Sequence, residues 1–219
     1  MGPHRDLTTG LESLKRKLLK MAQLAENMID AAIAELAQRD VGLAAKVPDY
    51  ERECNRFQID IDESALSILA TQQPVARDLR YLLTLDHVTY ELERIGDHAS
   101  SVAKQVIKLA PEPPLADYVK LPEMAERSAV LVHGVLRALV DADAVAAREV
   151  AVLDDDIDRL YHATFDEVVD LMRQDPNNVE RGTRIIIASH YLERIGDRST
   201  NIAEDIVYLV TGDVEDLNP

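Results

Sequence analysis

The feature that most constrains the fold is an internal repeat. The hexapeptide LERIGD occupies residues 92–97 and returns letter for letter at residues 192–197. Between the longer segments 92–110 and 192–210, eight of nineteen residues are identical. Apolar or small residues recur in both segments at a spacing of three and four, which is the period of a helix with one buried face. The repeat therefore predicts two similar helices, each with the same face turned toward a core.

The repeat extends upstream, where residues 38–55 align with residues 141–158. Each copy then has three helical segments, which can bury their apolar faces only against one another. We expect an all-α chain of two tandem, pseudo-symmetric, antiparallel three-helix bundles, spanning residues 10–110 and 115–212 around a Pro-rich junction. Pro74 and Pro176 are expected at first helical positions, after the possible caps Gln73 and Asp175. The predicted helices cover residues 10–39, 42–71, 74–109, 118–141, 144–173 and 176–211.

Composition excludes several classes of function. The net charge of −16 argues against a nucleic-acid partner and against a basic membrane-binding surface. No run of about 20 apolar residues is present, so we expect no transmembrane helix. Cys54 is the only cysteine, so no internal disulfide can form, which fits a reducing cytoplasm.

The repeated motif carries two acidic residues on one side of its helix. Glu93 and Asp97 are four residues apart, so they share a face, which we expect to point away from the apolar stripe. Their repulsion costs a few tenths of a kcal/mol, and Gly96 costs roughly 1 kcal/mol relative to Ala. Glu193 and Asp197 repeat the pair. A cation between the carboxylates would offset the repulsion.

A further acidic pair precedes the second copy of the motif. If the second and third helices of that bundle are antiparallel neighbours, Asp154 and Asp158 could converge with Glu193 and Asp197. Four carboxylates would form a hard-oxygen site suited to magnesium, manganese, ferric iron or calcium.

The first copy offers a weaker set of ligands. Glu51 aligns with Asp154, but Asn55 replaces Asp158. Downstream, Ser101 and Lys104 replace Asn201 and Glu204. We therefore expect the N-terminal site to bind metal less well than the C-terminal one.

Other residues around the motifs have two readings. Arg94 and Arg194 are either clamps that hold the carboxylates or ordinary surface ion pairs. Gly96 and Gly196 permit close approach of a neighbouring helix or of a partner. We expect four residues to surround the metal ligands: Arg94, Arg194, Asn201 and Glu204. His190 is a less favoured candidate ligand.

Catalytic signatures are missing from the chain. No His has a Glu three residues before it, as bundle-core di-iron sites require. No Gly-rich phosphate loop, HExxH motif or nucleophile–histidine signature stands out. We therefore expect a protein that is not an enzyme.

The chain resembles the PhoU family. The resemblance rests on LERIGD in the third helix of each unit and on QPVARDLRYL at 73–82, and it spans residues 10 to 217. It implies a pair of three-helix bundles with metal clusters on acidic E(D)xxxD motifs. That pattern falls on Glu93/Asp97, Glu193/Asp197 and Asp154/Asp158 and is broken at Glu51/Asn55. The metals it implies are divalent or trivalent ions such as iron, zinc, magnesium or manganese.

The resemblance also implies a role. A protein of this family would be a negative regulator of the phosphate-starvation response and a modulator of phosphate uptake. It would link the ATPase of a phosphate ABC transporter to a phosphate-sensing histidine kinase. It would be a cytoplasmic homodimer that reaches the inner membrane face through its partners. Two alternatives remain open: a metal-dependent phosphatase or oxidase, and a purely structural helical scaffold.

Overall fold

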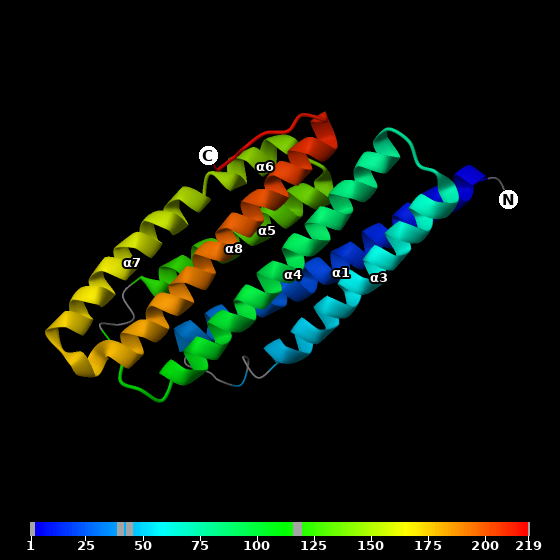
Figure 1. Cartoon of the computed structure of the whole chain (residues 1–219). Coiled ribbons are helices and arrows are strands. Elements are labelled where there is room, and N and C mark those ends of the chain that lie inside the picture. Colours follow the sequence, from blue (N-terminus) through cyan, green and yellow to red (C-terminus); the bar gives the residue numbers. More distant parts are fainter. Residues whose placement is uncertain (1–2, 39–41, 43–45, 116–119, 219) are drawn as a thin grey trace.

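The computed structural model describes residues 3–38, 42, 46–115 and 120–218 (Figure 1). Within these ranges the chain forms helices joined by turns and contains no strand. The elements are α1 (Pro3–Gln38), α3 (Val47–Gln72), α4 (Arg77–Leu109), α5 (Leu121–Asp141), α6 (Ala144–Ala151), α7 (Asp154–Gln174), the 3-10 helix η2 (Pro176–Asn178) and α8 (Val179–Thr211). None of the described helices is long and apolar enough to cross a bilayer.

The helices form two groups of the predicted kind. In the first group, α1, α3 and α4 pack on one another. In the second, α5, α7 and α8 do so, and the short α6 packs on α5 and α8. The predicted fold class of two pseudo-symmetric three-helix bundles is therefore confirmed. The boundaries 10–110 and 115–212 stay predictions.

The apolar stripe accounts for the packing of α4 and α8. Its eight positions in α4, from Leu85 to Leu109, are all buried. The corresponding positions in α8 are buried as well, except Leu209, which is half-buried. Burial of these side chains is the main favourable contribution to folding, at roughly 25 cal/mol per Å² of apolar surface.

The two groups meet mainly along α4 and α8, which run antiparallel beside each other (Figure 1). We call this contact the α4–α8 seam. Glu91 of α4 pairs with Arg198 of α8 at 3.3 Å. The corresponding positions with the roles exchanged are His98 and Tyr191, whose rings stack with centroids 5.6 Å apart. The two LERIGD hexapeptides therefore lie opposite each other near the middle of the seam.

One predicted helix start is wrong. Pro74 lies outside α4, which begins at Arg77. Gln73 ends α3 in the left-handed conformation with φ 47°, and Ala76 also has φ 47°, so the chain turns before it enters the next helix. At the corresponding point of the second group the prediction is confirmed. Pro176 opens η2, and the Asp175 side chain caps it by accepting from the Asn177 amide.

The predicted helix 144–173 is interrupted. A turn at Val152 and Leu153 separates α6 from α7. Helix α7 then opens on three consecutive aspartates, 154–156, and carboxylates in a first turn are stabilised by the positive end of the helix dipole. Helix α1 begins earlier than predicted, at Pro3, and α5 begins at Leu121. The expected boundaries at residues 39 and 118 lie outside the described residues.

Candidate metal centre

Three of the predicted ligands converge between α7 and α8. Asp158 comes from α7, and Glu193 and Asp197 come from α8. One carboxylate oxygen of each lies within 4.8 Å of the others. All three side chains are partly buried, so they do not stand on an open surface as the sequence suggested. We call these three residues the C-terminal cluster.

Asp154 lies beside this cluster and is almost completely buried, with 2% of its surface exposed. Its Oδ2 accepts hydrogen bonds from Thr200 Oγ1 at 3.1 Å and from Asn218 Nδ2 at 3.0 Å. Its Oδ1 has no donor. That oxygen lies against Gly196, where any Cβ would collide with it. The glycine of the second motif is therefore needed to admit a carboxylate.

An arginine spans the two acids of each motif. In the second copy, Arg194 Nη1 donates to Asp197 Oδ2 at 2.9 Å, and its Nε lies 3.4 Å from Glu193 Oε2. In the first copy, Arg94 makes the same two contacts with Asp97 and Glu93, both at 3.3 Å. A guanidinium placed in this way offsets the repulsion of the carboxylates. These contacts therefore favour the interpretation of Arg94 and Arg194 as clamps that hold the carboxylates over that of ordinary surface ion pairs.

The pKa values of the acids are raised in the absence of a metal. Burial is the largest cause for Asp154, whose pKa rises to about 7, and the nearby carboxylates add to the shift. The pKa values of Asp158, Glu193 and Asp197 are also raised, in each case mainly by burial. A bound cation would favour the ionised forms and reverse these shifts.

The donor set fits a divalent or trivalent cation. Asp154 Oδ1, Asp158 Oδ1 and Glu193 Oε2 are buried oxygens without a hydrogen-bond donor. Buried acceptors are rarely left unsatisfied, and carboxylate oxygens are the preferred ligands of hard cations. His190 Nδ1 lies 3.5 Å from Glu193 Oε2 and could supply a nitrogen ligand. These residues would hold the ion, which would neutralise their charge.

The first copy of the motif is arranged differently. We call Glu51, Glu93 and Asp97 the N-terminal cluster. Glu51 Oε2 accepts a hydrogen bond from Ser100 Oγ at 2.5 Å. The positive charge of Lys104 acts to lower the pKa of Asp97, although burial keeps it raised. Among the described residues, the only set of three ligand atoms within 4.8 Å of one another is the C-terminal one.

The first glycine also has a different neighbour. A Cβ on Gly96 would lie 2.6 Å from Met28 Cε and 3.9 Å from Cys54 Sγ. Cys54 is a buried free thiol whose pKa is raised to about 12 by burial and by the N-terminal cluster. Gly96 therefore serves apolar packing rather than a carboxylate.

Two residues expected to support the C-terminal cluster are engaged elsewhere. Asn201 Nδ2 donates to Glu91 Oε1 at 3.2 Å across the seam. Glu204 Oε1 accepts from the Leu217 amide at 2.9 Å. Both lie on the same side of α8 as Asp197, but their hydrogen bonds in this structure go to partners outside the cluster. That they surround the metal ligands stays a prediction.

Sequence reasoning missed several neighbours of the cluster. Thr200 and Asn218 bind Asp154, and His162 lies near enough to Asp158 and Glu193 to act on their pKa values. The spacing of four residues between Asp158 and His162 could have revealed the histidine. No pattern points to Asn218, because it reaches the site through the fold of the C-terminal segment.

That segment is fastened at three points. Arg148 makes a bidentate pair with Glu215 at 2.7 and 2.6 Å. The Leu217 amide and the Asn218 side chain provide the other two contacts, with Glu204 and Asp154. The segment therefore ends over the buried acid of the candidate site.

Comparison with known proteins supports the repeat. The family model described as the PhoU domain matches residues 18–106 and again residues 121–206. The chain is similar to a phosphate-specific transport system accessory protein PhoU homolog of Pseudomonas aeruginosa, with 38% identity over 92% of this chain and 84% of the relative. The corresponding homolog of Clostridium acetobutylicum is 34% identical over 95% of both chains.

Two crystal structures are similar to the whole chain. That of PhoU from Pseudomonas aeruginosa superposes with a TM-score of 0.90 at 37% identity and covers 94% of this chain and 99% of the other. That of the phosphate transport system regulatory protein PhoU from Streptococcus pneumoniae gives 0.86 at 28% identity, covering 96% and 99%. The duplicated domain, the sequence similarity and the shared fold lead to one conclusion: this chain belongs to the PhoU family.

Proposed function

We propose that this protein is an accessory protein of a phosphate-specific transport system, with a regulatory rather than enzymatic role. Two findings support this proposal. The PhoU domain is present twice, and relatives described as phosphate-specific transport system accessory proteins align with nearly the whole chain. The solved relative from Streptococcus pneumoniae is itself described as a phosphate transport system regulatory protein.

We further propose that the C-terminal cluster binds a metal ion. Its support is the convergence of three carboxylates within 4.8 Å and the buried oxygens that lack donors. The ion would neutralise part of the −16 charge and fix α7 against α8. The N-terminal cluster would bind the same ion more weakly, because Ser100 and Lys104 compete for its carboxylates.

The regulatory role would be that of an adaptor. The metal-bearing helical body would dock on the transporter ATPase or on a phosphate-sensing histidine kinase when phosphate is plentiful, and so repress the starvation response. This would bring a cytoplasmic protein to the inner membrane face through its partners. The homodimer implied by the resemblance stays a prediction, which light scattering of the purified chain can test.

The experiment is a double substitution, Glu193→Ala with Asp197→Ala. We expect the variant to remain helical by circular dichroism, to lose bound metal by mass spectrometry, and to recover less ATPase or kinase in pull-downs from phosphate-replete cells. The matched control is Asp166→Ala with Asp170→Ala, an exposed pair on α7 at the same spacing and with the same change of charge.

The outcomes separate the parts of the proposal. Unchanged metal content in the double variant would reject the metal site. Failure of the wild-type chain to recover either partner, in replete and in starved cells, would reject the adaptor. Turnover of phosphoesters by the metal-loaded protein, abolished by Asp197→Ala, would reject the non-enzymatic role.

A further inference from the structure

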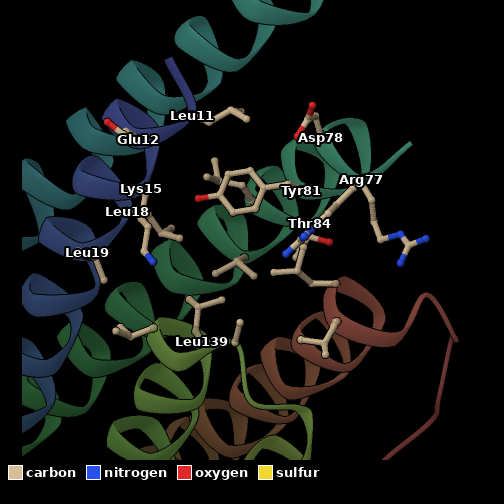
Figure 2. A pocket seen from close by; sticks show the side chains of 17 residues that line it. Leu11, Glu12, Lys15, Leu18, Leu19, Arg77, Asp78, Tyr81, Thr84 and Leu139 are labelled. Atoms are coloured by element: carbon tan, nitrogen blue, oxygen red, sulfur yellow. The ribbon is translucent and has the colours of Figure 1, made fainter. Parts of the chain in front are cut away.

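A large cavity lies at the opposite end of α4 from the Pro-rich junction. It has a volume of about 610 Å³ and is formed by α1, the first turns of α4, and the ends of α5 and α8 (Figure 2). Its walls are mainly leucine and valine side chains, including Leu18, Leu139 and Leu209. Cavities of 300–1,000 Å³ with apolar walls and a few polar groups are typical of small-molecule sites.

The cavity contains a buried hydroxyl group without a partner. Thr84 lines it and is 4% exposed, yet its Oγ1 makes no hydrogen bond. Threonines inside helices usually donate to the carbonyl four residues earlier. Thr89, one and a half turns further along α4, does so to Leu85 O at 2.7 Å. The Thr84 Oγ1 itself is buried, and a rotation about χ1 would turn it toward a group bound in the cavity, near the ring of Tyr81 (Figure 2).

The charged groups of the cavity are also unpaired. Lys15, Arg77 and Arg80 line it together with Glu12 and Asp78, and none of these five makes an ion pair with a described residue. This is unusual in a chain of net charge −16, where most of the described arginines bind a carboxylate. Arg80 stacks over the ring of Tyr208 at 5.5 Å, and its two terminal nitrogens lie beside Gly212.

The polar groups of the cavity are dominated by donors. Lysine and arginine only donate, and the hydroxyls of Tyr81 and Thr84 can donate. Such a set suits a carboxylate or phosphate group, which arginine binds through paired hydrogen bonds. The apolar walls suit a hydrocarbon chain.

We propose that this cavity binds a small single-chain amphiphile with an anionic carboxylate or phosphate head group. The hydrocarbon chain lies among the leucines of α1, α5 and α8. The head group accepts hydrogen bonds from Thr84 and from the cations of α4. A recessed pocket of this volume favours a small molecule over a docked protein, since protein interfaces are larger and flatter.

The second copy of the motif helix does not repeat these features. Arg181 and Arg184 stand where Tyr81 and Thr84 stand in α4. Arg181 donates to Pro113 O at 2.9 Å, and Arg184 pairs with Glu180. The unpaired hydroxyl and cations thus belong to the α4 end alone, so the site is not a by-product of the duplication.

Calorimetry with decyl phosphate, used below its micelle concentration, tests the proposal. We expect binding of one equivalent, at least about tenfold tighter than that of the uncharged decyl maltoside, because only the phosphate can use the cations. Inorganic phosphate alone should bind at least about tenfold more weakly than decyl phosphate. Equal affinity for the charged and uncharged probes, or equal affinity for inorganic phosphate, would overturn the proposal. Binding only to anionic lipid vesicles would overturn it as well, because it would indicate a membrane surface.

Substitutions locate the site. Arg77→Gln and Arg80→Gln should each weaken decyl phosphate binding about fivefold. Arg56→Gln is the matched control, because Arg56 is exposed on α3, unpaired among the described residues and outside the cavity. Val140→Glu should weaken binding about tenfold by placing a carboxylate at the cavity wall. Val130→Glu, on the same helix but outside the cavity, should leave binding unchanged.

Thr84→Val gives a readout that packing alone would not produce. The substitution keeps the shape of the side chain and removes only the hydroxyl. We expect the melting temperature to stay the same or rise, because the hydroxyl has no partner in the free protein, while decyl phosphate affinity falls about fivefold. Unchanged affinity in Thr84→Val and in both arginine variants would overturn the proposed head-group position.

Discussion

The two acidic clusters show how the same hexapeptide can give two different sites. Both have an arginine between a glutamate and an aspartate. In the C-terminal cluster, α7 adds Asp158 and the buried Asp154. In the N-terminal cluster, α3 adds Asn55 and a Glu51 that is bound to Ser100. The neighbouring helix, and not the motif, therefore decides how many carboxylates meet.

The two motif glycines differ in the same way. Gly196 faces a carboxylate oxygen of Asp154, whereas Gly96 faces the methyl end of Met28. Gly196 leaves room for a carboxylate, and Gly96 leaves room for an apolar side chain of the core. Identical residues in a duplicated chain thus carry different roles, and four experiments on variants can separate those roles.

The largest effect should come from the seam, where the copies differ in charge. Glu91 is buried and accepts from Arg198 and Asn201, whereas the corresponding Tyr191 stacks on His98. Glu91→Ala should lower the free energy of unfolding by about 2–3 kcal/mol, because it leaves a partly buried arginine without its partner. Urea unfolding measures this. Glu126→Ala, an exposed position on α5, should change it by less than about 0.5 kcal/mol. A similar loss of stability in both variants would show that the Glu91–Arg198 pair contributes no more to stability than an exposed residue does.

The glycines should respond unequally to alanine. Alanine favours a helix by about 1 kcal/mol over glycine, but at Gly196 its Cβ collides with Asp154. We expect Gly196→Ala to lower stability by about 1–2 kcal/mol and to reduce metal content. Gly96→Ala meets only the flexible end of Met28, so its stability should change by less than about 1 kcal/mol. Thermal unfolding and metal analysis of the two variants decide the matter, and equal losses would contradict the comparison.

A single substitution should make the clusters more alike. Asn55→Asp restores the carboxylate that Asp158 supplies in the other copy. Metal affinity of the N-terminal cluster should rise about tenfold, while stability without metal falls by a few tenths of a kcal/mol through added repulsion. Titration is best done in a Glu193→Ala/Asp197→Ala background, so that only the N-terminal cluster can bind. Unchanged affinity would show that Ser100 and Lys104 limit the site more than Asn55 does.

The smallest effect concerns pH, and it also distinguishes the copies. Across the seam, His87 Nδ1 lies 2.9 Å from Asp205 Oδ2, whereas the corresponding residues, Ile187 and Gln105, do not titrate. Burial raises the pKa of Asp205 to about 6 despite the opposite pull of His87. Burial acts to lower the pKa of His87, but the charge and hydrogen bond of Asp205 outweigh it and raise this pKa.

Both shifts have the same sign for stability. A raised carboxyl pKa means that the folded state holds its proton longer, so stability falls as pH rises from about 4 to 6. A raised histidine pKa gives stability that is present below about 6.5 and lost as pH rises through the folded pKa. The melting temperature of Asp205→Asn relative to wild type should therefore rise between pH 5 and pH 8. Asp141→Asn, which is exposed, should show no such trend. A flat difference for Asp205→Asn would contradict this account.

Much of the fold could be predicted from the sequence, since the apolar stripe of α4 has the period of a buried helix face and is buried at every position. The convergence of Asp158 with Glu193 and Asp197 could be anticipated because antiparallel neighbours bring equal spacings together. The turn at Val152 and Leu153 could not, since these apolar residues fit a continuous helix equally well. The role of Asn218 and the capture of Asn201 by Glu91 depend on contacts between distant segments, which no local pattern encodes.

The seam has one more consequence, which concerns symmetry. Glu91 contacts Arg198, and His98, the counterpart of Arg198, contacts Tyr191, the counterpart of Glu91. This reciprocal pattern defines an isologous interface, the kind that joins the two subunits of a homodimer. Here it is closed within one chain and buried. A second copy of this protein would therefore have to associate through a different face, and any dimer would have a rotation axis distinct from the one that relates its two halves.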